Sequence, residues 1–298
     1  MRDFGGRTAF ITGGASGIGL GMAQAFIARG MNVVIADLLH SHLDEAGGKL
    51  SGTNRLHCIR LDVSDRQAMH AAAEETRAIF GAVHVLCNNV GVSQRNPMDE
   101  ASYADWDYVL GVNVGGTVNG LVEFLPGMKA HGEGGHVVNT SSMAGMIPVP
   151  SFAGIYATSK FAVRGLSDAL RLALAPYRIG VSVLCPGLVK SRAMTAGDLY
   201  RQAHEADRGR EELREAIDGG MDPAEVGEAV ADAIERNAPY IFPHGEFRDE
   251  VAACFDEMLR AFPTDFTMDE RRREGEERRA RTTAEAKAVA DALGREEV

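Results

Sequence analysis

Three residues between positions 142 and 160 bring together the groups that a proton transfer needs: a serine hydroxyl, a tyrosine phenol and a lysine ammonium. Tyr156 and Lys160 are four positions apart, so a helix places both side chains on one face, one turn apart. A phenol has a pKa near ~10 and is a poor base at neutral pH unless a nearby positive charge favours the phenolate. Lys160 supplies that charge, and Ser142 is then placed to hold a substrate oxygen while Tyr156 moves the proton. A tyrosine and a lysine at this spacing also occur by chance on helices, so the pair gains its weight from the rest of the chain.

A glycine-rich turn near the N-terminus is the second part of the pattern. An apolar strand is expected at 7–12, GGASGIG follows at 13–19, a helical pattern stops at Gly30, and a second strand covers 31–37. In such a unit the glycines let the backbone approach a pyrophosphate, and the N-terminus of the helix meets its charge. The unit predicts a dinucleotide site. The alternative is a structural glycine turn followed by a surface aspartate.

Asp37 ends the second strand, eighteen residues after Gly19, where its carboxylate can accept hydrogen bonds from ribose hydroxyls. A carboxylate repels a 2′-phosphate, and Leu38 and Leu39 follow it instead of an arginine. The sequence therefore favours NAD as cofactor, with NADP less favoured.

Lowering the pKa of the Tyr156 phenol by about three units takes roughly 4 kcal/mol. The Lys160 ammonium, a nicotinamide cation and a partly dry site can together supply it.

Strands and helices alternate along most of the chain. Strand patterns lie at 55–65, 83–91, 135–142 and 180–187, and helical patterns lie at 65–80, 103–129 and 156–175. This alternation predicts an α/β protein with a three-layer Rossmann fold: a doubly wound parallel sheet of about seven strands with helices on both faces. Such sheets bind ligands at the carboxyl ends of their strands, where this chain places Thr12, Asp37, Asp62, Asn89, Ser142 and Pro186.

The pattern changes after Pro186. Residues 188–222 are polar and helical in pattern but not core-like, which suits a lid over a substrate site. An amphipathic helix is expected at 222–237, where an aspartate can cap it and a proline takes the first turn, and the last strand is expected at 238–245.

These patterns divide the chain into a Rossmann-fold domain at 1–245 and a helical C-terminal extension at 246–298. Within the extension, residues 269–281 are charged at eleven of thirteen positions. The first interpretation of this run is a solvated helix or a frayed tail, and the second is a contact between subunits.

Taken together, the motifs resemble the short-chain dehydrogenase/reductase superfamily over about residues 4–245. The resemblance rests on TGGASGIG at 12–19, Asp37, the Asp-Val pair at 62–63, NNVG at 88–91, Asn113 within VNV, the serine of NTSSMAG, YATSK at 156–160 and PGLVKS at 186–191. It implies that Tyr156 is the general acid/base, that Lys160 lowers the Tyr156 pKa and binds the nicotinamide ribose, and that Ser142 holds the substrate oxygen. It also implies that Asn113 holds a water linking Lys160 to solvent. The residues that would line the dinucleotide are Gly13, Ser16, Gly17, Ile18, Gly19, Asp37, Asp62, Val63, Asn89, Gly91, Tyr156, Lys160, Pro186, Gly187, Val189 and Ser191.

The chain departs from the family pattern in three places. NNVG replaces the usual NNAG, and the spacing of fourteen between Ser142 and Tyr156 is one longer than the commonest pattern. We attribute the extra residue to the loop MIPVPSFAG and choose Ser142 over Ser141 because it precedes MAG. Ser191 stands where a threonine is usual, and its hydroxyl can still donate a hydrogen bond to the nicotinamide carboxamide.

A narrower resemblance concerns the substrate. AFITGGASGIG, GVNVGGTVNGLVEFLPGM and APYIFPHGEFRDEV are similar to segments of bacterial dehydrogenases that oxidise the benzylic Cα alcohol of lignin-type β-aryl ethers. This implies a bulky aromatic secondary alcohol, and the expected pocket loop MAGMIPVPSFAGI is almost wholly apolar. The expected function is hydride transfer between a secondary alcohol or ketone and NAD.

The amino-acid composition limits the classes of partner that the protein can have. The 298 residues carry a formal net charge of −11, which argues against nucleic acid or an anionic membrane as a partner. No apolar run approaches the ~20 residues of a membrane span, and the N-terminal apolar stretch leads directly into a glycine loop rather than a signal-peptide cleavage site. The four scattered cysteines suit reduced thiols in a cytoplasmic protein, and the histidines show no metal-ligand spacing. We expect a homodimer or homotetramer that packs through the helices at 103–129 and 156–175.

Two other functions stay open. A dinucleotide-binding sensor or scaffold has the same fold, but it does not need Asn113, Ser142, Tyr156 and Lys160 together. A sugar-nucleotide epimerase or dehydratase shares the tyrosine–lysine pair, but such proteins usually space the glycine turn differently and carry a larger substrate domain. The physiological substrate, its stereochemistry and the favoured direction stay open as well.

Overall fold

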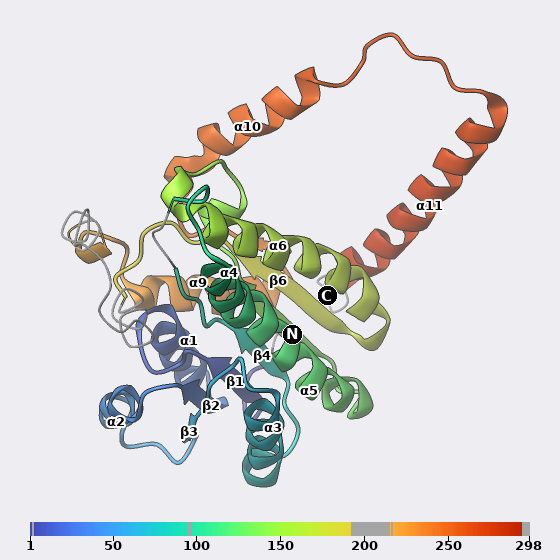
Figure 1. Ribbon diagram of the computed structural model, residues 1–298. Coiled ribbons are helices and arrows are strands. Elements are labelled where there is room, and N and C mark those ends of the chain that lie inside the picture. The colour runs from blue at the N-terminus through green and yellow to red at the C-terminus, as the bar shows by residue number, and fades with distance from the viewer. Residues whose placement is uncertain (2, 94–96, 192–214, 216, 294–298) are drawn as a thin grey trace.

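A parallel sheet forms the centre of the protein. The computed structural model describes residues 1–298 except 2, 94–96, 192–214, 216 and 294–298 (Figure 1). Within this part of the chain, seven strands lie in the order β3-β2-β1-β4-β5-β6-β7, and every neighbouring pair is parallel. The strands are β1 Thr8–Thr12, β2 Asn32–Asp37, β3 Leu56–Arg60, β4 Val85–Asn88, β5 Gly135–Thr140, β6 Ile179–Leu184 and β7 Tyr240–Ile241. The order reverses between β1 and β4, so the point at which such sheets bind ligands lies beside the glycine turn.

Helices cover both faces because the central strands are apolar on both sides. Alternate residues of β1 point to opposite faces: Ile11 packs in the core beneath α1, α2 and α9, whereas Phe10 packs in the core beneath α3 and α5. The helices are α1 Gly17–Ala28, α2 His40–Lys49, α3 Arg66–Phe80, α4 Tyr103–Leu110, α5 Gly116–Ala130, α6 Gly154–Leu174 and α9 Pro223–Arg236. The predicted three-layer fold is confirmed.

Three predicted elements differ in detail. The helix expected at 103–129 is one continuous run whose middle turn, Gly111–Gly115, is a π-helix. The last strand was expected at 238–245 but contains only Tyr240–Ile241, because prolines, which cannot donate to a ladder, stand at 239 and 243. Helix α2 was not predicted, since only two of its ten residues, Leu43 and Ala46, are buried and its apolar pattern is weak. The predicted lid at 188–222 falls mostly outside the described residues.

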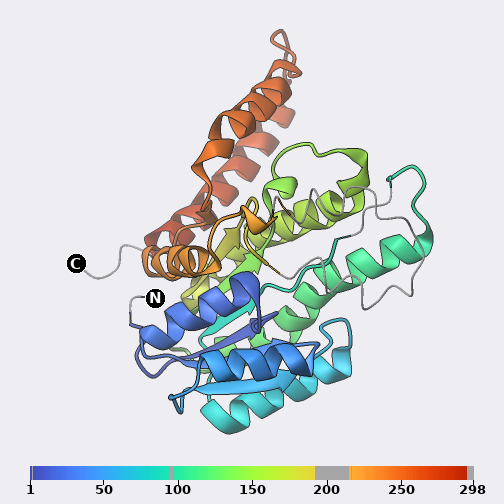
Figure 2. The same ribbon diagram turned by 90° about the vertical axis from the view of Figure 1, so that its left-hand side faces the viewer.

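The C-terminal segment extends away from the body as two helices, α10 Arg248–Arg260 and α11 Glu270–Ala292 (Figure 2). α10 buries no residue and α11 buries only Ala290, so the charged run at 269–281 lies on an exposed helix of the single chain. The alternative of a contact between subunits stays a prediction. The end of α11 returns to the body, where Asp291 pairs with Arg171 of α6 at 3.0 Å. None of the described helices is long and apolar enough to span a membrane.

Candidate active site

Tyr156 and Lys160 lie on successive turns at the start of α6, which begins at Gly154. The Lys160 Nζ atom is 5.4 Å from the centroid of the Tyr156 ring, so the two side chains share one face of the helix. Nζ also donates a 2.9 Å hydrogen bond to the carbonyl oxygen of Thr140, the last residue of β5. That carbonyl fixes the ammonium at the carboxyl edge of the sheet, and Lys160 is only 2% exposed.

The two adjacent serines after β5 have different surroundings. The Ser141 hydroxyl is buried and donates to the Lys160 carbonyl at 2.7 Å, so it ties β5 to α6. The Ser142 hydroxyl instead lowers the pKa of the Tyr156 phenol, and its Oγ accepts from the Ala144 amide at 3.2 Å. The choice of Ser142 as the substrate-facing serine stays a prediction.

The pKa values of the pair reflect a dry site. Burial raises the pKa of Tyr156, and the hydrogen bond from Ser142 opposes that change. Burial also lowers the pKa of Lys160, to about 8. In the polypeptide, desolvation is the larger influence on the Tyr156 pKa. The lowering expected from Lys160 and a nicotinamide cation acting together stays a prediction.

Asn113 lies in the π-helix, a local feature that is frequent at functional sites. Its Nδ2 donates to the Val92 carbonyl at 2.9 Å and to the Ser159 hydroxyl at 2.8 Å, and its Oδ1 accepts from the Val92 amide at 2.8 Å. The side chain thus fastens the segment after β4 to α6. A Cβ atom on the intervening Gly91 would lie 3.0 Å from Lys160 Nζ, so Asn113 and Lys160 approach each other across a glycine. The predicted water relay stays a prediction.

Asn89 connects three strand ends. Its backbone amide donates to Thr12 Oγ1 at 2.9 Å, its Nδ2 donates to the Thr12 carbonyl at 3.1 Å, and its Oδ1 accepts from Thr140 Oγ1 at 3.2 Å. Thr140 was not singled out from the sequence, although its carbonyl binds Lys160 and its hydroxyl binds Asn89. Its position directly before the serine pair is the signal that could have found it.

The glycine turn fits a bound dinucleotide. A Cβ atom on Gly19 would lie 2.0 Å from the Gly13 carbonyl oxygen, so only glycine allows the start of α1 to come this close to the turn. The first turn of α1 is left without a side-chain cap, because Ser16 makes no capping bond. Uncapped amides at a helix N-terminus suit a phosphate group. Ser191 packs against the same turn, since a Cβ atom on Gly17 would lie 3.0 Å from its Cβ.

The acidic residues of the predicted set lie at the ends of β2 and β3. Asp37 accepts a 3.3 Å hydrogen bond from the Leu39 amide and lies 3.8 Å from His42 Nδ1, and burial raises its pKa. Asp62 accepts bonds from both the amide and the hydroxyl of Ser64, at 2.9 and 2.6 Å, which shape the turn after β3.

Two predicted residues turn their side chains away from the site. The side chains of Val63 and Val189 belong to the two main cores. Each has only backbone atoms to offer a ligand at the carboxyl edge. Pro186 and Gly187 follow β6 and lie next to Ser142, whose Oγ is 3.5 Å from the Pro186 carbonyl oxygen.

Comparison with known proteins agrees with this geometry. Residues 7–199 match the family model of the short chain dehydrogenases. The chain belongs to the short-chain dehydrogenase family. It is 38% identical to the C alpha-dehydrogenase of Sphingobium sp. over 268 residues, which cover 87% of each protein. The narrower resemblance is thus confirmed together with the family, and the family binds a nicotinamide cofactor.

Solved structures give the same result. The apo form of LigO from Sphingobium sp. strain SYK-6 is 38% identical, has a TM-score of 0.77, and aligns over 95% of this chain and 98% of its own. A short chain dehydrogenase/reductase from Burkholderia phymatum in complex with NAD is 32% identical, has a TM-score of 0.83, and aligns over 90% of this chain and 100% of its own. The protein is therefore an oxidoreductase of this family.

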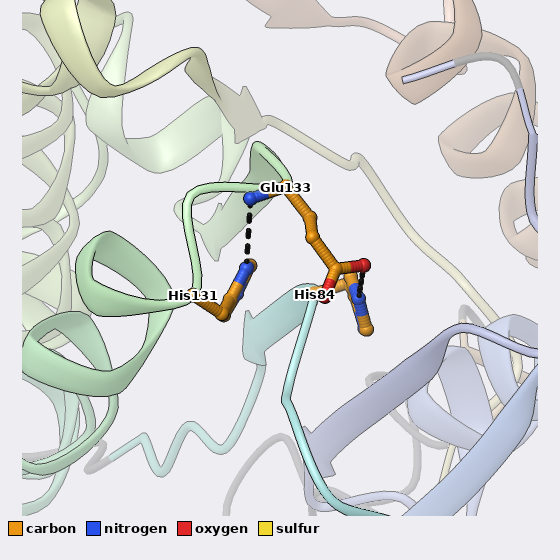
Figure 3. A group of neighbouring side chains, drawn as sticks. All are labelled: His84, His131 and Glu133. Carbon is orange, nitrogen blue, oxygen red and sulfur yellow. Dashed lines mark hydrogen bonds and ion pairs between the residues drawn. The ribbon is translucent and has the colours of Figure 1, made fainter.

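A second polar cluster lies at the opposite, amino edge of the sheet: His84, His131 and Glu133 (Figure 3). Its ring nitrogens already have partners. His84 Nδ1 accepts from the Thr8 amide at 3.2 Å, which leaves the proton on Nε2, 3.1 Å from the Glu133 carboxylate. A metal at Nε2 needs the other tautomer and would break the bond to β1. We therefore interpret the cluster as a tie between the starts of β1, β4 and β5.

Proposed function

We propose that the protein is an NAD-dependent secondary-alcohol dehydrogenase, which acts as a ketone reductase in the reverse direction. The observation that carries this proposal is the convergence of the Tyr156 phenol, the Ser142 hydroxyl and the Lys160 ammonium at one edge of the sheet. That edge is also where β1 leads into the glycine turn at 13–19. A protein that only senses or binds a dinucleotide has no use for this set.

The roles follow from the donor and acceptor capacities of the three side chains. Ser142 holds the substrate oxygen, and Tyr156 accepts the hydroxyl proton in oxidation or donates it in reduction. Lys160 stabilises the phenolate and binds the ribose next to the nicotinamide. NAD supplies the hydride acceptor. Holding the alcohol between Ser142 and Tyr156 removes the entropic cost of bringing acid/base and substrate together.

Asp37 supports NAD over NADP in this proposal. Its carboxylate is largely buried at the end of β2 and accepts the Leu39 amide, so it stays fixed at the position expected for the adenosine ribose. Placing a 2′-phosphate next to a buried carboxylate has a large electrostatic cost.

We propose a bulky, apolar or aromatic alcohol as substrate. The loop between β5 and α6 is apolar, and Met143, Met146 and Ile147 form a small buried cluster behind Ser142. Met98 approaches the start of α6 closely, since a Cβ atom on Gly154 would lie 2.7 Å from its sulfur. The similarity to a C alpha-dehydrogenase supports the same class. We also propose that residues 1–245 form the dehydrogenase domain and 246–298 an extension, and that the protein is a cytoplasmic homodimer or homotetramer.

The test is NADH formation from a panel of aliphatic, steroid and aryl secondary alcohols, with NAD and NADP compared in parallel. Tyr156→Phe should lower kcat by roughly 10²–10⁴-fold, the usual contribution of general acid–base catalysis, and should leave NADH binding within a few-fold of wild type. Tyr103→Phe is the matched control, because Tyr103 is 90% exposed on α4. Tight NADH binding with no turnover of any alcohol would contradict the proposal, as would an active Tyr156→Phe variant.

A further inference from the structure

His244 lies in the segment after β7, beyond the residues that match the family model. It is 6% exposed, and both of its ring nitrogens are bonded to the segment that follows β6. Nδ1 accepts a 3.1 Å hydrogen bond from the Gly187 amide, and Nε2 is 3.0 Å from the Leu188 carbonyl oxygen. A carbonyl only accepts, so Nε2 carries the proton and Nδ1 is the free acceptor. One neutral tautomer therefore satisfies both bonds.

The Pro186–Gly187 peptide is held at both of its ends. Its carbonyl oxygen accepts from the Met143 amide at 2.9 Å and lies 3.5 Å from Ser142 Oγ, while its amide donates to His244. A planar peptide that is anchored at both ends has a fixed orientation. His244 therefore acts on the same peptide group that contacts Ser142.

Neighbouring groups keep the imidazole in place. The ring of Phe247 meets the His244 ring edge-on, with centroids 6.2 Å apart, and a Cβ atom on Gly187 would lie 2.6 Å from Phe247. The Leu188 carbonyl oxygen accepts a second hydrogen bond, at 3.0 Å, from the Met221 amide. The histidine is thus the central link between the C-terminal part of the chain and the 186–188 segment.

We propose that His244 is a positioning residue that fixes the Pro186–Gly187 peptide where the nicotinamide end of the dinucleotide binds. This rests on the proposed function, in which the 186–191 segment receives the nicotinamide. The Nδ1 acceptor is the essential atom. Without it the Gly187 amide has no partner in this position, and the peptide loses the anchor opposite Met143 and Ser142.

Two substitutions of His244 test the hydrogen bonds of its two ring nitrogens separately. His244→Asn keeps an acceptor close to the position of Nδ1, and His244→Gln keeps a donor close to the position of Nε2. The affinities of both variants for NADH and for ADP-ribose, which lacks the nicotinamide, are measured by fluorescence and calorimetry. We expect His244→Gln to weaken NADH binding about fivefold, the usual effect of one lost hydrogen bond, and to leave ADP-ribose binding within about twofold of wild type. His244→Asn should stay close to wild type for both ligands.

Equal weakening of NADH and ADP-ribose binding would show a general structural role and overturn the proposal. Unchanged NADH binding in His244→Gln would overturn it too, as would a folded His244→Asn variant that binds NADH as poorly as the glutamine variant. If His244→Gln does not fold, Phe247→Leu, which releases the ring contact, should weaken NADH binding and spare ADP-ribose. His70→Gln, on the outer surface of α3, is the control and should change neither affinity. Wild type that binds NADH but oxidises no alcohol would refute the dehydrogenase function and leave the His244 comparison intact.

Discussion

Replacing Lys160 by methionine should inactivate the protein without destabilising it at neutral pH. Lys160 is 2% exposed, and burial lowers its pKa to about 8 from the ordinary value near ~10.4. Between these two values the unfolded chain binds more protons than the folded protein, so the contribution of Lys160 to stability rises with pH across this window and is least favourable below pH ~8. At pH ~7 the lowered pKa of Lys160 therefore costs the folded protein roughly 3 kcal/mol of stability.

Methionine has a similar length and no charge, so Lys160→Met removes this cost. The variant also loses the hydrogen bond to the Thr140 carbonyl, worth about 1.5–3 kcal/mol for a charged donor. The net gain in the free energy of unfolding at pH ~7 is therefore about 0–2 kcal/mol. The difference between variant and wild type should shrink by about 1 kcal/mol between pH ~7 and ~9, because the folded wild type loses the Lys160 proton over this range while the unfolded chain keeps most of it.

Urea unfolding followed by circular dichroism at neutral and alkaline pH measures this difference. The thiol of Cys87, whose pKa is raised by burial, ionises in the alkaline range only in the unfolded chain, and this contribution is common to both proteins and cancels. Lys129→Met, at an exposed position of α5, is the matched control and should show no pH-dependent difference. A stability difference between Lys160→Met and wild type that is the same at pH ~7 and ~9 would refute the reasoning, as would full turnover in the variant.

Two further predictions concern a buried histidine and the cofactor. His136 is fully buried against the Ser182 hydroxyl, and burial lowers its pKa to about 3, so the stability present above pH ~6.5 is lost as pH falls. In urea unfolding, wild type should therefore lose about 2 kcal/mol more than His136→Gln between pH ~6.5 and ~4.5. Parallel curves for the two proteins would contradict this. Asp37→Ala should lower the preference for NAD over NADP, measured as the ratio of kcat/KM values, by at least about tenfold, or roughly 1.4 kcal/mol of lost discrimination. An unchanged ratio would mean that another group discriminates between the cofactors.

Local spacing was enough to predict part of the site. The four-residue interval between Tyr156 and Lys160 fixes their shared face on any helix, and α6 has that geometry. The alternation of strands and helices likewise predicted a doubly wound parallel sheet, and the seven-stranded sheet has this architecture. Asp222 and the proline after it marked the start of α9 correctly.

Contacts between distant segments could not be found in this way. His244 is separated from Gly187 by 57 positions, and nothing in its own neighbourhood shows that its ring faces the end of β6. The position of Thr140 before the serine pair could have drawn attention to it, but its bond to Lys160 uses a backbone carbonyl 20 positions away, so no side-chain type indicates that contact. Burial is a further feature that sequence spacing does not show: the interval between Tyr156 and Lys160 identifies the nearby charge but not the desolvation that raises the Tyr156 pKa.

The two pKa changes at Tyr156 and Lys160 have a common consequence. Burial raises the pKa of the Tyr156 phenol and lowers that of Lys160 to about 8, so it favours the neutral form of each group. Proton abstraction, in contrast, requires the phenolate beside the ammonium. The folded chain therefore holds both groups in place without stabilising their ionised pair. A cationic ligand that binds next to them shifts the balance toward the phenolate, and by linkage the phenolate form binds that ligand more tightly. The same dry surroundings that disfavour the base in the free protein thus strengthen its response to a bound positive charge, because electrostatic interactions grow as water is excluded.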